Sequence, residues 1–168
     1  MVEPIAAASP IFRELSDPDA TSALAGRIAP WTRPGDVVAL RGGLGLGKTA
    51  FARAFINAFA RHAGAPVPDE IPSPTFNLVQ IYEFPQCAVY HFDLFRVETP
   101  SEAHELGIEE AFADSVSLIE WPDRLGGLLP ADRLEIELRD GRDDNARRAE
   151  ITGLGGWSNR VNEIFRDG

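Results

Sequence analysis

The chain has 168 residues, of which 44% are hydrophobic and 25% charged, so it is long enough for one hydrophobic core and predicts a single domain over residues 1–168. Its formal net charge of −10 repels phosphate backbones, which disfavours direct, non-specific binding of nucleic acid. No apolar run approaches the ~20 residues that cross a bilayer, and the N-terminus lacks a basic start followed by an apolar block. We therefore expect a cytoplasmic protein with no membrane association.

The first part of the chain predicts a helix, a strand and a second helix. The segment "LSDPDATSALAGRIAPW" offers Ser16 or Asp17 as a cap, places Pro18 near the first turn and continues with apolar residues at helical spacing. The segment "PGDVVALRGG" predicts a turn and a short apolar strand that ends where the glycines begin. Apolar residues then repeat with a helical period from Lys48 to about Arg61, so a glycine-rich loop joins the strand to the second helix.

The rest of the chain predicts two hairpins, with a helix and a strand between them. A proline-rich loop, "HAGAPVPDEIPSP", precedes a hairpin of "TFNLVQIYEF" and "CAVYHFDLF". A helix follows in "TPSEAHELGIEEAFA", interrupted or ended by Gly107, and then the strand "SVSLIEWP" and the loop "DRLGGLLPAD". A second hairpin of "RLEIELRD" and "RRAEIT" leads to a short helix from about Trp157 to Phe165. This order predicts an α/β domain with a mixed central sheet flanked by helices.

The glycine-rich loop matches the phosphate-binding pattern G-x-x-x-x-G-K-[ST], from Gly42 through Gly47 and Lys48 to Thr49. Glycines let backbone N–H groups surround phosphate oxygens, and the following helix presents its positive end to the same anion. Lys48, the one lysine among sixteen basic residues, would reach the β- and γ-phosphates, and Thr49 would bind magnesium. The alternative is a glycine-rich turn that matches by chance. The predicted nucleotide-binding residues of this segment are Gly42, Gly43, Leu44, Gly45, Leu46, Gly47, Lys48, Thr49 and Ala50.

Two acidic residues follow apolar strands and are candidate catalytic groups. "VYHFD" ends in Asp93 and "SLIE" ends in Glu120, and ligands of open α/β sheets bind at the carboxyl ends of strands. A turn or cap role for Asp93 and a plain strand-end charge for Glu120 are the structural alternatives. The loop "PSPTF" carries the hydroxyl residues Ser73 and Thr75. It is interpreted either as a switch that senses the γ-phosphate or as a plain connecting turn.

The other residues that could carry chemistry show no such pattern. Cys87 is the single cysteine, so it has no partner for an internal disulfide. His62, His91 and His104 lack tight metal-ligand spacing, and we expect ordinary structural roles for them.

Taken together and in order, "GGLGLGKTAFARAF", "SPTFNLVQIYE", "YHFDLFRV", "ELGIEE" and "LIEWPDR" resemble the TsaE family, the P-loop ATPase of bacterial tRNA threonylcarbamoyladenosine synthesis. The resemblance covers about residues 12–157. It implies a single P-loop NTPase-like domain that uses ATP and Mg²⁺, with the metal held by Thr49 and Glu120. It also implies that Asp93 lies near the γ-phosphate and its attacking water.

The same resemblance implies the remaining site residues and the partners. The loop from Ser73 to Thr75 would be the nucleotide-responsive switch, Trp121 would lie beside the site, and the early segment around Asp17 and Thr21 would contact the nucleotide base, which makes Asp17 a predicted nucleotide-binding residue. Proteins of the family work with TsaD and TsaB, and ATP hydrolysis would reset that complex between turnovers. Contact with tRNA would then be indirect, through the complex.

Two positions depart from the family pattern without removing a phosphate or magnesium ligand. Gly43 stands where an acidic or amide side chain is usual, and Ala50 follows Thr49 where a second threonine is common. Both changes bear on the fine geometry of the loop.

Two other functions fit the same loop. A small-molecule P-loop kinase would need arginines over the phosphates, for which Arg96 and Arg124 are candidates, but no arginine cluster marks a lid. A nucleotide-dependent interaction module with little hydrolysis is the second, because the hydrolysis rate depends on the exact placement of water. A GTPase is disfavoured, since the chain has no N-K-x-D segment to read guanine.

Overall fold

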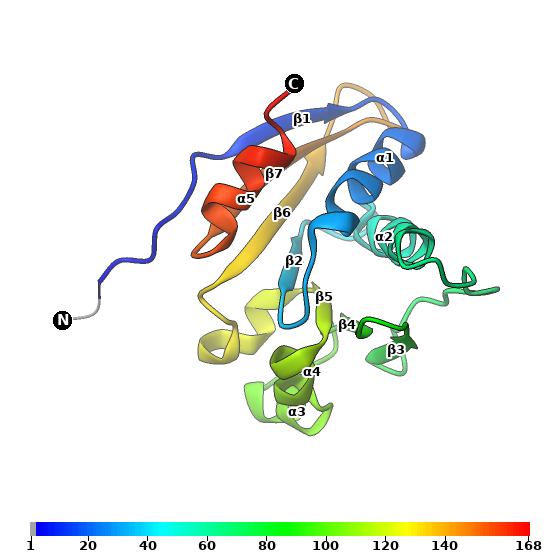
Figure 1. Ribbon diagram of the computed structural model, residues 1–168, viewed down its shortest axis with the longest axis vertical. Coiled ribbons are helices and arrows are strands. Elements are labelled where there is room, and N and C mark those ends of the chain that lie inside the picture. Colours follow the sequence, from blue (N-terminus) through cyan, green and yellow to red (C-terminus); the bar gives the residue numbers. More distant parts are fainter. Residues whose placement is uncertain (1–2) are drawn as a thin grey trace.

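The computed structural model describes residues 3–168, and a seven-stranded mixed sheet runs through it (Figure 1). The strands are β1 (Ile11–Leu15), β2 (Val37–Arg41), β3 (Val79–Glu83), β4 (Ala88–Asp93), β5 (Val116–Glu120), β6 (Arg133–Asp140) and β7 (Arg147–Leu154). They are ordered β1-β7-β6-β2-β5-β4-β3 across the sheet. The four central strands β6, β2, β5 and β4 are parallel, and antiparallel pairing adds β7 and β1 at one edge and β3 at the other.

Helices cover both faces of this sheet. They are α1 (Pro18–Ile28), α2 (Lys48–His62), α3 (Pro100–Glu105), α4 (Ile108–Asp114) and α5 (Trp157–Ile164), with 3-10 segments η1 (Ala29–Trp31) and η2 (Pro122–Leu128). Helices α1, α2 and α5 pack on one face and share its hydrophobic core. Helices α3 and α4 and segment η2 pack on the opposite face, against β2, β4 and β5. The prediction of an α/β fold with a mixed, helix-flanked sheet is confirmed.

The central strands are apolar along their length because both of their faces are buried. In β2, Val38 and Leu40 belong to the core under α1 and α2, whereas Val37 belongs to the core on the opposite face. In β5, Leu118 and Ile119 divide between the two cores in the same way. Continuous apolar runs of this kind are typical of parallel strands covered on both sides. The cores thus fix which face each strand residue occupies, including the polar residues at the strand ends.

Three segments differ from the sequence-based expectation. β1 is an additional strand, paired antiparallel with β7 at the sheet edge. β3 begins at Val79 and not at the start of "TFNLVQIYEF", because Pro74 to Leu78 form a turn in which the Leu78 N–H donates to the Pro74 carbonyl at 2.7 Å. The expected loop after β5 contains the 3-10 segment η2. The interruption at Gly107 is confirmed, since this residue has φ 81° and separates α3 from α4.

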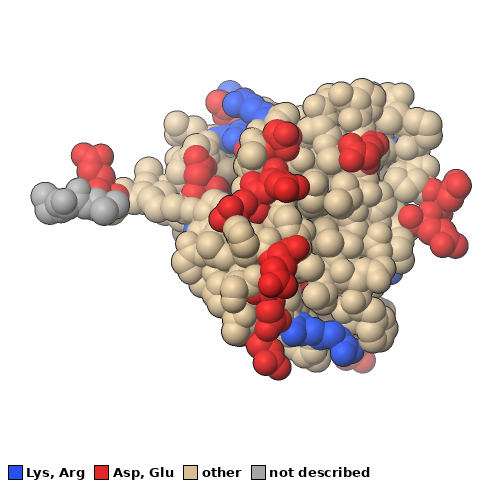
Figure 2. Space-filling view, turned by 90° about the horizontal axis from the view of Figure 1, so that it is seen from below, with Lys and Arg blue, Asp and Glu red and all other residues tan. Residues whose placement is uncertain are grey.

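The surface is acidic where α3 and α4 lie. Figure 2 views the molecule from below Figure 1, and acidic side chains predominate over basic ones on this face. The two helices carry the exposed residues Glu102, Glu105, Glu109 and Glu110. None of the helices between residues 3 and 168 has the length and apolar character needed to span a membrane.

Candidate functional site

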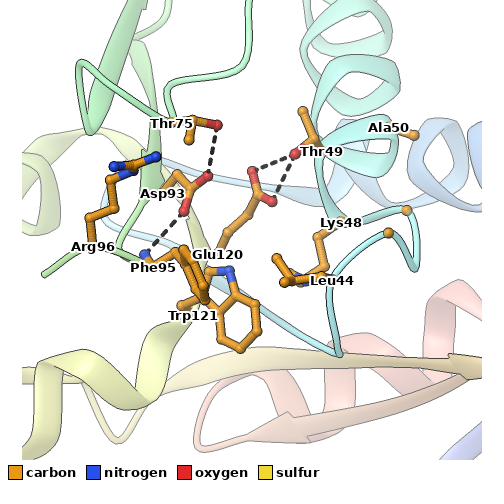
Figure 3. A pocket seen from close by; sticks show the side chains of 12 residues that line it. Leu44, Lys48, Thr49, Ala50, Thr75, Asp93, Phe95, Arg96, Glu120 and Trp121 are labelled. Atoms are coloured by element: carbon orange, nitrogen blue, oxygen red, sulfur yellow. Dashed lines mark hydrogen bonds between the residues drawn. The ribbon is translucent and has the colours of Figure 1, made fainter.

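The carboxyl ends of β5 and β4 and the glycine-rich loop that follows β2 line a pocket of about 410 Å³ (Figure 3). β2 leads into the glycine-rich loop, and α2 begins at Lys48. Asp93 and Glu120 are register partners on β4 and β5, and Glu120 is also the partner of Leu40 on β2. The pocket is lined by Leu44, Gly45, Gly47, Lys48, Thr49, Ala50, Thr75, Asp93, Phe95, Arg96, Glu120 and Trp121.

The loop depends on glycine at its two ends. Gly47 has φ 101° and stands directly before α2, so the helix N-terminus faces the pocket. Gly42 has φ 141°, and a Cβ there would lie 2.7 Å from the Leu138 carbonyl oxygen on β6. The loop therefore packs closely on β6, with main-chain groups where side chains would obstruct an anion.

Lys48 is 5% exposed and turns back onto its own loop. Its Nζ donates hydrogen bonds to the carbonyls of Gly42 at 2.8 Å and Gly43 at 2.7 Å, and lies 4.4 Å from the centroid of the Trp121 ring. Burial lowers the pKa of Lys48 from its ordinary value, and the negative charges of Glu120 and Asp93 offset part of that shift. The ammonium is thus held at the pocket by neutral partners, two carbonyl acceptors and an aromatic ring, which a charged phosphate oxygen could replace.

Thr49 and Glu120 form the part of the pocket that fits a metal ion. The Thr49 hydroxyl donates to the Glu120 carboxylate, with Oγ1 2.9 Å from Oε1 and 3.1 Å from Oε2. Hydroxyl and carboxylate oxygens are hard donors that suit Mg²⁺, which usually takes one or two protein ligands and completes its shell with phosphate oxygens and water. Within residues 3–168 no cluster of three or more histidine, cysteine or acidic residues could hold a metal. The donor set therefore fits Mg²⁺ bound together with a nucleotide.

Asp93 makes the turn contact that the structural alternative predicts, and it also lines the pocket. Its Oδ1 accepts a hydrogen bond from the Phe95 N–H at 3.1 Å, which shapes the turn after β4. Its Oδ2 faces the pocket and lies 3.5 Å from the Thr75 hydroxyl. Ser73 is exposed, does not line the pocket and contacts Thr75 at 2.7 Å. The loop predicted as a switch thus reaches the site through Thr75.

Asp17 lies away from the pocket wall and caps α1, where its Oδ1 accepts from the Ala20 N–H at 2.8 Å. Nearby, on the other side of the glycine-rich loop, is a second hollow of about 220 Å³. Thr21 lines it, and Asn145 closes it from the β6–β7 turn. The lining residues are Pro18, Thr21, Gly45, Leu46, Gly47, Ala50, Asp144, Asn145 and Arg147. Thr21, one of the residues predicted to contact the base, thus lines a hollow, whereas Asp17 lines neither hollow and serves as the cap of α1.

Phe95 and His91 were not singled out from the sequence as parts of the site, whereas Arg96 was considered only as a candidate arginine of a kinase lid. Phe95 and Arg96 line the pocket because the chain turns back at Asp93, and the Arg96 guanidinium lies 4.9 Å from the Phe76 ring centroid. His91 lies under the site, with Nε2 2.7 Å from Glu120 Oε2. The alternation of β4 could have indicated His91, since it stands two residues before Asp93 and shares its face.

Fold and loop define the class of protein: a P-loop NTPase-like domain with its phosphate-binding loop between β2 and α2. A solved structure with the same arrangement is Bacillus subtilis YdiB, which matches with a TM-score of 0.74 and 28% sequence identity over 98% of both chains. The family model for the threonylcarbamoyl adenosine biosynthesis protein TsaE matches residues 15–149.

Related sequences agree with this match. The chain is 39% identical to the tRNA threonylcarbamoyladenosine biosynthesis protein TsaE of Rickettsia bellii over 82% of its own length and 92% of that protein. It is 35% identical to the TsaE protein of Bacillus subtilis over 83% of each chain. The chain belongs to the TsaE family.

The close packing of the loop on β6 predicts that Gly42→Ala destabilises the protein. The new Cβ would meet the Leu138 carbonyl oxygen and impose a strained φ, so we expect the free energy of unfolding to fall by about 2–3 kcal/mol in urea denaturation. The matched control is Gly43→Ala, whose Cβ would meet only Leu46 Cδ1 at 3.7 Å and should change stability by less than about 1 kcal/mol. Equal losses in the two variants would contradict this reading of the loop.

Proposed function

We propose that the protein is the Mg²⁺-dependent ATPase subunit of the tRNA threonylcarbamoyladenosine machinery, working in the cytoplasm with TsaD and TsaB. The observation that carries the proposal is the contact of 2.9 Å between the Thr49 hydroxyl and the Glu120 carboxylate. It brings two hard oxygen donors together at the N-terminus of α2, beside the buried ammonium of Lys48. Anion and cation sites that adjoin in this way suit a magnesium nucleotide.

The glycine-rich loop, Lys48, Thr49 and Glu120 have parts in this proposal that their positions support. The main-chain N–H groups from Gly43 to Thr49 would hold the phosphates, and Lys48 would exchange its carbonyl partners for β- and γ-phosphate oxygens. Mg²⁺ held by Thr49 and Glu120 would neutralise charge on the phosphates. The base would lie toward the second hollow, beside Thr21.

Asp93 is the proposed group that orients the attacking water. Its Oδ1 is engaged by the Phe95 N–H, whereas Oδ2 faces the pocket next to Thr75. A carboxylate with one oxygen fixed and the other directed into the pocket can accept a hydrogen bond from water in a defined direction. Thr75 would couple that orientation to the loop that begins at Ser73.

Membership of the TsaE family supports a role in the tRNA threonylcarbamoyladenosine pathway, and the surface charge is compatible with the proposed work through partner proteins. A chain with a net charge of −10 and exposed acids on α3 and α4 is expected to have low affinity for the phosphate backbone of a nucleic acid. Its contribution to tRNA modification is therefore proposed to pass through TsaD and TsaB and not through its own contact with tRNA. Arg96 at the pocket keeps the small-molecule kinase as the second candidate.

Chemical modification of Lys48 tests nucleotide binding. An amine reagent should modify this residue and the N-terminus alone, and magnesium ATP should protect Lys48 selectively, as measured by intact-mass and peptide mass spectrometry. Because burial lowers the Lys48 pKa, its reactive neutral form should appear at a lower pH than in an ordinary lysine. Lys48→Ala should lose the modification and weaken ATP binding by at least about 100-fold. Unprotected Lys48 at saturating nucleotide would count against the site.

Two conservative variants separate the roles of the acids. Asp93→Asn keeps an oxygen that accepts from the Phe95 N–H, so the turn should persist while turnover falls about 100-fold or more with ATP binding retained. Glu120→Gln should weaken Mg²⁺-dependent hydrolysis more than it weakens ATP binding, since it removes the carboxylate charge. The measurements are steady-state hydrolysis and equilibrium nucleotide binding. Unchanged turnover in Glu120→Gln would remove this residue from the metal site.

ATP turnover with and without partners tests the function as a whole. We expect slow hydrolysis by the protein alone and faster release of inorganic phosphate when TsaD and TsaB are both added. Transfer of labelled phosphate to a metabolite, without stimulation by the partners, would instead identify the kinase. Tight ATP binding with no hydrolysis under any condition would identify the interaction module.

A further inference from the structure

His91 lies at the buried side of the proposed metal site and is 0% exposed, in contrast to the exposed His62 and His104. Its Nε2 is 2.7 Å from Glu120 Oε2. We propose that His91 is a positioning residue that fixes the Glu120 carboxylate for binding Mg²⁺. The inference rests on the proposed function, in which Glu120 and Thr49 hold the metal.

The strand register brings His91 to this position. His91 and Asp93 are two residues apart on β4, so their side chains project to the same face of the sheet. Asp93 pairs with Glu120 on β5, and His91 pairs with Leu118, two residues earlier on the same strand. The side chains of Glu120 and His91 therefore lie on the same face of the sheet, on neighbouring strands and two residues apart in register.

Glu120 is 3% exposed and is held from two directions. From the pocket side the Thr49 hydroxyl donates to the carboxylate, and from the core side His91 reaches Oε2. The Thr49 hydroxyl has one proton to share between Oε1 at 2.9 Å and Oε2 at 3.1 Å, so the histidine supplies the second donor that this buried carboxylate needs. Since the carboxylate accepts, Nε2 is the ring nitrogen that carries the proton.

The other ring nitrogen argues against a role in packing alone. Nδ1 of His91 is buried and has no hydrogen-bond partner within residues 3–168. An unpartnered polar atom costs about 1–3 kcal/mol, and an apolar side chain at the same place would avoid this cost. What the histidine supplies, and a leucine would not, is the hydrogen bond to Glu120.

Fixing Glu120 Oε2 by a hydrogen bond from His91 affects how the Glu120 carboxylate and Thr49 can bind a cation. Because the hydrogen bond to Oε2 already restricts the Glu120 side chain, the carboxylate loses less conformational entropy when it binds a metal together with Thr49. Partners of this kind are known to change metal affinity about 10–100-fold when they are removed. The expected signature is thus a change in Mg²⁺ requirement with little change in the fold or in metal-free nucleotide binding.

The matched variants are His91→Gln and His91→Asn. The Gln amide nitrogen ends near the position of Nε2 and can still donate to Glu120, whereas the shorter Asn amide ends near Nδ1 and cannot reach it. Fluorescent-ADP binding is titrated with Mg²⁺ and repeated in EDTA, and thermal unfolding of the nucleotide-free proteins is measured in parallel. His91→Asn should raise the Mg²⁺ midpoint about 10–100-fold with similar binding in EDTA, and His91→Gln should restore most of it. His104→Leu, at an exposed histidine, is the control and should leave the midpoint unchanged.

A second readout needs no nucleotide or metal. Imidazole ¹⁵N shifts of the free protein should show His91 protonated at Nε2, and Glu120→Gln should perturb that signal but not those of His62 and His104. Protonation at Nδ1, or equal Mg²⁺ midpoints in wild type and His91→Asn, would overturn the inference while leaving the proposed function in place. Nucleotide binding by the wild type that does not respond to Mg²⁺ would instead overturn both. Should His91→Asn fail to fold, the ¹⁵N spectra and His91→Gln still decide, because a midpoint raised tenfold or more in His91→Gln would count against the donor role.

Discussion

The register of the three parallel strands β2, β5 and β4 is the constraint on which the site depends. It sets Glu120 opposite both Leu40 and Asp93, on the face that α2 covers. Because side chains alternate along a strand, a slip of one residue in β5 would turn Glu120 toward the core under α3 and α4. The apolar residues that precede each acid prevent such a slip, since every one of them would then leave its own core. The two buried layers thus act together to aim two carboxylates at one pocket.

Glu120 contacts both Thr49 and His91, and the other charged groups of the site lie around it. Its carboxylate is almost fully buried and is tolerated because Thr49 and His91 donate to it and the Lys48 ammonium lies nearby. Lys48 in turn is held by two carbonyls and the face of Trp121, which are modest partners for a buried charge. Charged phosphate oxygens are stronger hydrogen-bond acceptors than carbonyls, so in the proposed function they would replace these partners of the ammonium.

Local sequence patterns were enough to predict the glycine-rich loop, both flanking elements and the strands that end in Asp93 and Glu120. These features are encoded by neighbours in sequence, namely apolar runs, glycines and the residues that follow them. β1 was missed because "IFREL" has five residues and becomes a strand through pairing with β7, which lies more than a hundred residues later. The contact of His91 with Glu120 and the approach of the β6–β7 turn to the loop depend on tertiary register in the same way. The position of Asp17 as a cap was readable from its sequence, whereas its distance from the pocket wall was not.

The acidic composition constrains how such a site can bind a polyanion. With a net charge of −10, long-range attraction cannot draw a triphosphate to the pocket, and two carboxylates on its floor oppose the phosphates at short range. In the proposed function, binding would then come from groups in direct contact: the loop amides, the N-terminus of α2, Lys48 and a cation shared with Glu120 and Thr49. In this setting the two acids would oppose a phosphate unless a divalent cation lay between them. A carboxylate as buried as Glu120, fixed from the core side, is therefore suited to make nucleotide affinity depend on Mg²⁺ and not on charge attraction alone.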